Sequence, residues 1–267
     1  MTASRHVSRA LAALVVCSAA VLPTVASASN YTGDSGRNKI TGTGKSDRID
    51  ARGGRDRIAG LNGNDRLKAG EGNDRAYGGD GADVIIYNAG DDRGRGGPGN
   101  DKLSGGGGND SLFGEQGHDR VSLGEGNDTG EGGPGNDWIH GITGNDVLIG
   151  GDGNDHPQGG KGTDRVYGGS GDDELDGGDG NDYLNAGDGN DQVTGDEGND
   201  TIYPGDGRDL IYAEEGDNHI IATNDGIKDD LYCSRINIGQ APGLLTYIGS
   251  RDPLDDVRNC IVEVVQD

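Results

Sequence analysis

The sequence predicts an all-β fold, a solenoid of stacked nine-residue repeats that ends in a small disulfide-bonded C-terminal cap. Three observations lead to this prediction. A pattern of glycine, aspartate and aliphatic residues recurs every nine residues from Gly33 to Ile221, in 21 copies without an insertion or a deletion. The segment after it loses this phase and holds two cysteines, Cys233 and Cys260. The chain contains 55 glycines and only one Trp and one Phe, so few large apolar side chains are present to form a conventional compact core.

Each position of the repeat has its own predicted role. In the copy that begins at Gly177, the first six residues form a loop, because glycine accepts positive φ and lets backbone carbonyl groups approach one another. The next three residues, 183–185, form a minimal strand, in which Leu184 at position eight points to one side and its neighbours to the other. One apolar residue in nine cannot make a core alone. Two consecutive repeats are therefore expected to form one turn of the solenoid, with the aliphatic side chains of two sheets meeting inside.

Three irregular copies are expected to weaken the stack. The eighth position is aliphatic in 18 of the 21 copies, and the exceptions are Gly94, Gly130 and Pro157. The two glycines remove the inward side chain and should leave the core thin. Pro157 removes a backbone donor in the middle of a strand.

The sixth position predicts a cation site. It is aspartate in 19 copies, with Asn38 and Asn218 at the two ends. Each loop offers a carboxylate and several carbonyl oxygens, and the loop one turn later offers the same set. Calcium accepts about six to eight oxygen ligands in tolerant geometry, whereas magnesium needs a tighter octahedron and transition metals prefer His or Cys. His and Cys do not recur in the pattern, which therefore predicts multiple Ca²⁺ ions between stacked loops.

From Gly33 to Ile221 the nonapeptide resembles the haemolysin-type calcium-binding repeat of RTX proteins, which has the form G-G-x-G-x-D-x-U-x. The resemblance implies a parallel β-roll in which calcium lies between successive loops on each side, held by loop aspartates and backbone carbonyl groups. Carried onto this sequence, the metal ligands it implies are Asp65, Asp74, Asp83, Asp92, Asp101, Asp110, Asp119, Asp128, Asp137, Asp146, Asp155, Asp164, Asp173, Asp182, Asp191, Asp200 and Asp209.

The first copies depart from this pattern. Lys45 replaces the glycine of position four, Asn38 replaces an aspartate, and Arg52 and Arg55 bring positive charge into the third loop. The N-terminal sites are therefore expected to bind calcium weakly or not at all.

Residues 1–28 have the features of a secretory signal peptide. Arg5 and Arg9 precede the apolar run 10–22, and residues 26–28 supply a cleavage pattern of small side chains. A lipoprotein signal at Cys17 is the alternative, but Val16 stands where a small residue is expected. Cleavage after Ala28 predicts a secreted, extracellular protein without a membrane span, with the β-roll at residues 29–221 and the cap at 222–267.

The cap is expected because a stack of repeats exposes an apolar end. Residues 222–267 carry the apolar runs 244–248 and 261–265. In an exported chain Cys233 and Cys260 are most simply one disulfide; a free thiol or a metal ligand is the alternative, without a matching pattern of His. The segment is similar to the cysteine-paired ends of secreted bacterial calcium-repeat proteins, although it lacks some of the glycines of such ends.

Charge is distributed unevenly along the chain, whose formal net charge is −24. Residues 31–120 contain 14 Lys and Arg against 15 Asp and Glu, a net charge of −1, whereas residues 121–267 contain 7 against 32, a net charge of −25. Such a chain repels itself and buries little apolar surface, which is typical of disorder without bound ions. Calcium is therefore expected to take part in the folding reaction.

Many cations of the first half fall at outward strand positions, with Arg57, Arg75 and Arg93 on one sheet at intervals of two repeats. We interpret this arginine row as neutralising neighbouring loop carboxylates and limiting aggregation of the sheet. Contact with an acidic surface or polysaccharide is the alternative.

The sequence contains no H-E-x-x-H, G-x-S-x-G or P-loop motif. The predicted function is that of a secreted, monomeric, non-catalytic structural protein that folds on binding calcium. One alternative is a calcium-dependent surface adhesin or matrix module with cell-surface or extracellular polysaccharide as partner. Another is an ice-binding roll, which would need regular rows of Thr or Asn that the outward positions lack. Nucleic acid is not an expected partner.

Overall fold

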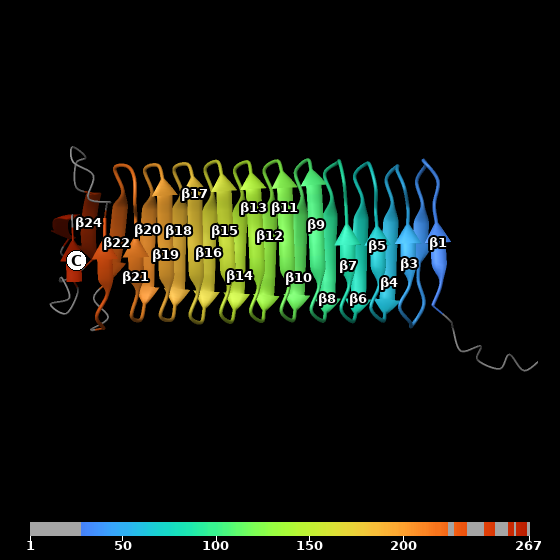
Figure 1. Cartoon of the computed structure of the whole chain (residues 1–267), viewed down its shortest axis with the longest axis horizontal. Helices are drawn as coiled ribbons and strands as arrows, with labels where there is room; N and C mark the ends of the chain where they lie inside the picture. The colour runs from blue at the N-terminus through green and yellow to red at the C-terminus, as the bar shows by residue number, and fades with distance from the viewer. Residues whose placement is uncertain (1–27, 224–226, 234–242, 249–255, 259, 266–267) are drawn as a thin grey trace, which may run out of the picture.

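The computed structural model describes residues 28–223, 227–233, 243–248, 256–258 and 260–265. Within these residues the chain alternates between two parallel sheets that run the length of the molecule (Figure 1). Each sheet has 13 strands, and consecutive strands of the chain belong to opposite sheets. The described residues contain no helix long and apolar enough to cross a membrane.

The odd-numbered sheet consists of β1 (Asn30–Thr32), β3 (Arg48–Asp50), β5 (Arg66–Lys68), β7 (Val84–Ile86), β9 (Lys102–Gly107), β11 (Arg120–Glu125), β13 (Trp138–Thr143), β15 (His156–Lys161), β17 (Glu174–Asp179), β19 (Gln192–Glu197), β21 (Leu210–Tyr212), β23 (Asp230–Tyr232) and β25 (Asp256–Arg258).

The even-numbered sheet consists of β2 (Lys39–Thr41), β4 (Arg57–Asn62), β6 (Arg75–Asp80), β8 (Arg93–Pro98), β10 (Ser111–Gln116), β12 (Thr129–Pro134), β14 (Val147–Asp152), β16 (Arg165–Ser170), β18 (Tyr183–Asp188), β20 (Thr201–Asp206), β22 (His219–Thr223), β24 (Gly243–Ile248) and β26 (Cys260–Val265).

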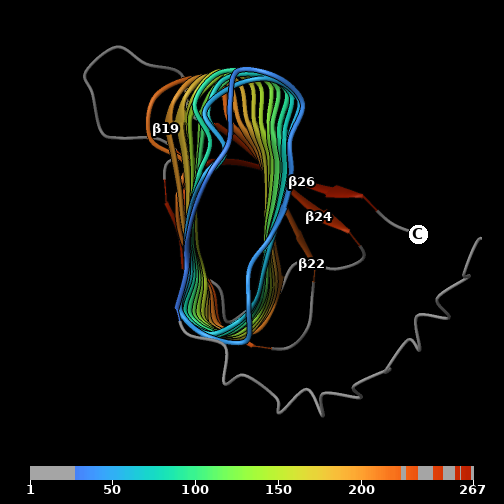
Figure 2. The same ribbon diagram turned by 90° about the vertical axis from the view of Figure 1, so that its right-hand side faces the viewer.

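The register confirms that two repeats make one turn. In the even sheet Leu184 pairs with Ile202, and in the odd sheet Val121 pairs with Ile139. Seen along the long axis, successive turns superpose into a flattened tube with two long walls (Figure 2). The parallel β-solenoid is thus confirmed.

Most strands are longer than the sequence predicts. Strand β18 continues past the three expected residues through Asp188, so it includes the first three positions of the next repeat. The reason is that Gly187 and Asp188 continue the ladder by pairing with Gly205 and Asp206 one turn later. Three-residue strands remain at both ends of the roll. The connecting loops are correspondingly shorter than the sequence predicts.

The core lies between the two sheets and is built from position eight, as predicted. These side chains form two clusters of buried residues, one that extends from Ile49 to Leu148 and one from Val166 to Leu245. The two clusters are separated at Pro157. The pairing of β15 with β17 begins only at Gln158, one residue after the proline, which agrees with a ring that carries no N–H donor.

The prediction of a thin core at Gly94 and Gly130 is wrong. Position one of the same repeat carries a large side chain in both cases, Tyr87 and Leu123, and both side chains are buried. A Cβ on Gly94 would meet the Tyr87 hydroxyl, and a Cβ on Gly130 would meet both methyl groups of Leu123. The Tyr87 hydroxyl also donates a hydrogen bond to the Arg93 carbonyl oxygen at 3.1 Å. The glycines therefore make room for side chains from the opposite sheet.

Both ends of the roll extend beyond the regular repeats. Tyr31 of β1 pairs with Ile49, so residues 30–32 occupy the strand positions of a further, incomplete copy. After Ile221 the nine-residue phase is lost, yet β23 and β25 continue the odd sheet and β24 and β26 the even sheet. Cys233 is buried after β23 and Cys260 begins β26, whose side chains lie outside the described residues. The predicted signal peptide, except for Ala28, also lies outside them.

Candidate metal centres

The aspartates of position six form two rows, one in the loops at each edge of the sheets, and all of them are buried. Residues two repeats apart in the sequence are neighbours within a row. The exposed fraction is 4% for Asp47 and lower for every later member, a set that contains all 17 predicted ligands. Burial of a carboxylate without a compensating charge or hydrogen bonds is costly. These rows therefore need partners.

One oxygen of each carboxylate has a backbone partner. The N–H of Asp47 donates to Oδ1 of Asp65 at 2.6 Å, and the N–H of Asp146 donates to Oδ1 of Asp164 at 2.7 Å. The same bond recurs at 2.6–3.0 Å along both rows. Each carboxylate is thus fixed against the turn before it.

The other oxygen has no protein donor. From Asp56 to Asp200 the Oδ2 atoms of 17 aspartates are buried without a hydrogen-bond partner among the described residues. A Cβ placed on Gly60 would collide with Oδ2 of Asp65 and with the carbonyl oxygen of Gly78 in the next turn. The carboxylate oxygen and a backbone carbonyl oxygen therefore border the same small space. The geometry recurs at Gly150, beside Asp155.

The loops also bring carbonyl groups close together along the stack. A Cβ on Gly72 or Gly180 would overlap the carbonyl oxygen of the equivalent glycine one turn earlier, Gly54 or Gly162. Both Gly72 and Gly180 have positive φ, 113° and 154°. From Gly54 onward position four is therefore glycine for two reasons: the backbone conformation and the contact with the previous turn.

Position two of the repeat is less restrictive. Ile142 and Glu115 occupy it with φ values of 84° and 77° in spite of their side chains. Glycine is therefore required most strictly at position four, where the loops of successive turns touch.

Burial and neighbouring carboxylates change the acidity of the rows. Burial is the largest cause and raises the pKa of Asp146, Asp173, Asp182 and Asp200 to about 7. In each case the backbone hydrogen bond from the preceding turn lowers the pKa and the negative charge of adjacent row members raises it further. In the absence of a cation the folded loops therefore favour protonated carboxyl groups.

The donor set fits a hard cation. Among the described residues no group of three or more His, Cys, Asp or Glu side chains gathers at one point. A site in the loop stacks must therefore combine one or two carboxylates with backbone carbonyl oxygens. Calcium accepts such all-oxygen sets in flexible geometry, whereas zinc and other transition metals select nitrogen and sulfur.

The two ends of the rows differ from the middle. Oδ2 of Asp47 accepts hydrogen bonds from the Thr43 N–H at 2.5 Å and the Thr43 hydroxyl at 2.9 Å, so its carboxylate is satisfied by the protein. The Asn218 side chain accepts from the Asp200 N–H at 2.8 Å and donates to the Ala213 carbonyl oxygen at 2.8 Å. Neither end needs a cation to complete its hydrogen bonding.

Two features were missed by sequence reasoning. Asp229 continues one row, because its Oδ1 accepts from the Asp209 N–H at 2.9 Å across a spacing of 20 residues. The run Asp229 to Tyr232 repeats the order aspartate, any residue, aliphatic, any residue, and this order could have indicated it. The second feature is a ladder at position five. Oδ1 of Asn109 accepts from the Asn127 N–H at 2.8 Å, and similar bonds recur along both loop stacks.

A family model described as the RTX calcium-binding nonapeptide repeat (4 copies) matches the sequence six times, at residues 32–67, 59–94, 95–130, 131–156, 158–193 and 194–225. The matches include nearly all of the two loop stacks. No curated protein matches the chain.

Proposed function

Because the chain belongs to the family of RTX calcium-binding nonapeptide repeat proteins, we propose that it is a secreted structural protein whose folding depends on calcium bound between stacked loops. The observation that carries the proposal is the row of buried Oδ2 atoms from Asp56 to Asp200, each without a protein donor in the described structure. Calcium supplies positive charge and accepts several oxygens at once. The chain supplies a fixed carboxylate and the carbonyl groups of the adjoining turn.

The residues proposed to hold calcium are the 17 aspartates from Asp65 to Asp209 that the sequence predicts. The Oδ2 of Asp56 is placed like those of the later aspartates, so this residue is a candidate as well. Asp47 is not, because Thr43 completes its hydrogen bonding. The proposed role is binding and folding rather than catalysis, and the signal at residues 1–28 is proposed to direct export with cleavage after Ala28.

The end of the roll is proposed to act as its cap. Strands β23 to β26 extend both sheets with longer connections, and Leu231 and Leu245 join the second core cluster. A bond between Cys233 and Cys260 would close a loop in this segment. Such a bond contributes about 3–4 kcal/mol by restricting the unfolded chain. Peptide mapping without reduction should recover the two cysteines in one linked peptide; recovery of both as free thiols would contradict the bond.

Circular dichroism during a calcium titration tests the proposal. The purified chain should be largely unfolded in EGTA at neutral pH and should gain β-structure at calcium concentrations of about 10⁻⁴ to 10⁻³ M. Magnesium should not replace calcium. Calorimetry should find many bound ions, and fewer than about four would contradict sites between successive loops. Stable β-structure in excess chelator at neutral pH would contradict calcium-dependent folding.

One isosteric variant separates the carboxylate charge from its hydrogen bond. Asp146→Asn keeps an oxygen that can accept from the Asp128 N–H, which Asp146 now binds at 2.8 Å, and removes the negative charge. The C-terminal end of one row already uses asparagine in this way, at Asn218. The variant should need more calcium to fold than the original chain and should bind fewer ions. An unchanged calcium midpoint would show that this carboxylate is not a ligand.

A further inference from the structure

The arginine row, Arg57, Arg75 and Arg93, stands on the outer face of the even sheet. Arg57 of β4 pairs in register with Arg75 of β6, which pairs with Arg93 of β8, and Lys39 of β2 precedes them. All four side chains are exposed. Neighbouring strands lie about 4.8 Å apart, so the row places like charges side by side, an unfavourable arrangement in a sheet.

The interpretation that this row neutralises loop carboxylates by contact is not supported by the structure. In the part of the chain that the structure describes, none of the three arginines forms an ion pair. The loop aspartates are buried and face away from solvent. Among the described residues the ion-paired arginine on this face is Arg95, which stands outside the row and binds Glu115 at 2.9 Å. The row therefore presents its charge to solvent.

A groove lies between this row and the next line of side chains, two positions further along each strand. One wall is the arginine row with Ser111, and the other consists of Tyr77, Arg95 and Phe113. The walls are separated by two residues of an extended strand, roughly 7 Å. The groove crosses β4 to β10 and so runs parallel to the long axis of the roll (Figure 1). Its width suits a single polymer chain rather than a duplex.

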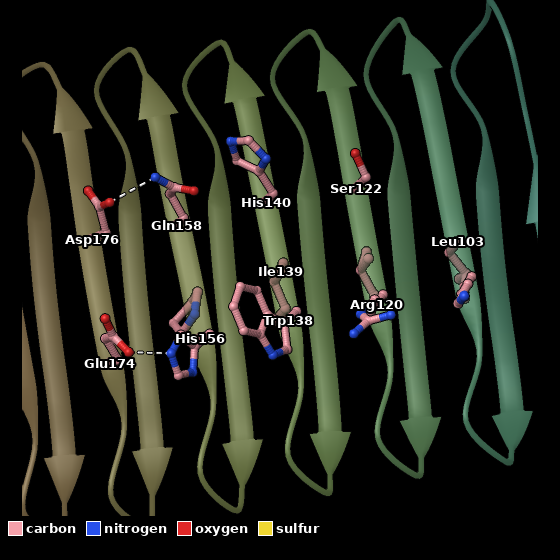
Figure 3. Close-up of a pocket in the computed structure, with 13 residues that line it drawn as sticks. Leu103, Arg120, Ser122, Trp138, Ile139, His140, His156, Gln158, Glu174 and Asp176 are labelled. Carbon is pink, nitrogen blue, oxygen red and sulfur yellow. Dashed lines mark hydrogen bonds and ion pairs between the residues drawn. The ribbon is translucent and has the colours of Figure 1, made fainter.

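A second groove lies on the outer face of the odd sheet, and its charged side chains can be compared with the arginine row. It is lined by the side chains of β9 to β17, with Trp138 stacked on His156 at 4.5 Å between ring centroids (Figure 3). There, acidic and basic or amide groups meet one another: Glu174 pairs with His156, and Gln158 donates to Asp176 at 2.7 Å. The charges of β15 and β17 in that groove are thus paired with one another, whereas Lys102 and Arg120 at its other end form no ion pair among the described residues. The arginine row lacks such partners within the described residues.

We propose that the groove beside the arginine row binds a linear acidic polysaccharide that lies along the roll. Guanidinium groups match carboxylate and sulfate groups with two parallel hydrogen bonds. A straight row with one cation for each strand spacing suits a polymer whose charges repeat at the spacing of its sugar rings. The proposal rests on the calcium-dependent folding proposed above, because only the folded roll aligns residues 57, 75 and 93.

Calcium also favours this binding through charge. Residues 31–120 have a net charge of −1 without metal. Bound calcium brings two positive charges per ion and would make this half of the molecule net positive, which attracts a polyanion.

Single-stranded nucleic acid is the other polyanion that a narrow basic groove could take. Proteins that bind it without sequence preference stack successive bases on exposed aromatic rings. Here the rings do not follow one another, because Arg95 stands between Tyr77 and Phe113 and its guanidinium lies over the Phe113 ring at 5.5 Å from the centroid. The arrangement therefore favours a polysaccharide.

Fluorescence anisotropy with a labelled, size-defined sulfated octasaccharide tests the proposal at saturating calcium. The original chain should bind it, and binding should weaken as salt is added. The triple variant Arg57→Ser, Arg75→Ser and Arg93→Ser should bind about tenfold more weakly or worse, because three exposed charge contacts are lost. Serine is compatible with the row, since Ser111 follows Arg93 in it. A neutral dextran oligosaccharide should not bind.

The matched control removes the same charge from the other face. The variant Arg48→Ser, Arg66→Ser and Lys102→Ser should bind the octasaccharide within about threefold of the original chain, because a change in net charge away from the groove should matter little at working salt. An equal loss of octasaccharide binding in both variants would overturn the proposal that the groove is the binding site, and would indicate attraction to net charge alone. Unchanged binding in the first variant would overturn it as well, as would tighter, row-dependent binding of a single-stranded oligonucleotide.

Circular dichroism on the same samples separates this proposal from the calcium proposal. If the original chain does not gain β-structure with calcium, the calcium-dependent folding is wrong. If it folds but does not bind the octasaccharide, the polysaccharide proposal is wrong. A second variant, with glutamine at residues 57, 75 and 93, keeps the length of the side chains and replaces the serine variant if that one fails to fold. Position seven also carries glutamine at Gln192, in the odd sheet.

Discussion

The first turns of the roll and the stretch from 137 to 200 share one backbone design but satisfy their loop carboxylates differently. In the second loop Thr43 donates two hydrogen bonds to Asp47, and in the first loop Asn38 takes the place of an aspartate. From Asp137 to Asp200, position six of each repeat is an aspartate whose Oδ2 lacks a protein donor in the described structure. The two regions therefore differ in how much they need a cation.

The difference shows that an identical fold can be stabilised in two ways along one chain. A carboxylate that accepts protein hydrogen bonds can remain charged and buried without metal. A carboxylate with one oxygen unpartnered requires either a proton or a cation. The net charge adds to the contrast, since residues 121–267 carry −25 and residues 31–120 carry −1. Calcium dependence should therefore be graded and strongest in the second region.

Acidification in the presence of chelator should produce the largest change. Burial raises the pKa of Asp146, Asp173, Asp182 and Asp200 from 3.8 to about 7, so the folded loops bind protons more tightly than the unfolded chain. This contribution to stability is fully present below pH 3.8 and is lost as pH rises through about 7. Far-UV circular dichroism in EGTA should therefore show more β-structure near pH 4 than at pH 8.

With calcium present the trend should reverse, because protons compete with the metal for the same carboxylates. The calcium midpoint should increase as the pH falls from 7 to 5. A midpoint that does not change with pH, together with an apo chain that gains no structure in acid, would contradict the role assigned to these carboxylates.

Alanine substitution of one row member in each region should give a smaller effect. Asp146→Ala and Asp56→Ala both remove an acceptor, for the N–H of Asp128 and of Asn38 respectively. The loss of the backbone hydrogen bond is therefore matched, and Asp56→Ala loses in addition the bond from the Asn38 side-chain amide at 3.2 Å. We expect Asp146→Ala to raise the calcium midpoint several-fold more, because its neighbours in the row also lack donors and the third loop carries Arg52 and Arg55. A larger effect of Asp56→Ala on the midpoint would refute the gradient.

A change at Pro157 should give the smallest effect and sharpen the boundary between the two core clusters. Pro157→Val supplies the missing N–H and an aliphatic side chain at position eight. We expect a gain of about 1–2 kcal/mol in the free energy of unfolding with calcium present, from one hydrogen bond and added apolar burial. Urea titration measures it, with Val166→Ile as a control that keeps an N–H and a β-branched side chain. A destabilised Pro157→Val variant would show that the proline is required here.

The sequence predicted those parts of the fold that depend on local periodicity. Leu184 at position eight and Asp182 at position six each recur every nine residues, so the two sheets, the core and the loop carboxylates followed from one copy. Contacts between side chains of the two opposite sheets could not be predicted in this way. Tyr87 fills the space at Gly94 from the opposite sheet, and this pairing appears only when the stacking of the two sheets is known.

The same limit applies to the site. The sequence indicated which aspartates share a row, but not that one oxygen of each is occupied by a backbone N–H while the other remains without a donor. The ladder of Asn109 and Asn127 at position five was also missed. Each side chain there binds a backbone N–H of the next turn, and every residue type except proline offers that N–H, so the sequence does not reveal the partner. Asp229 was missed because two extra residues precede it.

Hydrogen exchange followed by mass spectrometry, at a series of calcium concentrations and neutral pH, tests the central claim most directly. Each repeat contacts chiefly its neighbours, so folding should spread from the sites that bind calcium most strongly. We predict little protection anywhere in chelator, protection of residues 137–200 at intermediate calcium, and protection of residues 38–75 only at higher calcium. Protection that is complete in chelator, or that reaches residues 38–75 before residues 137–200, would contradict graded, calcium-dependent folding.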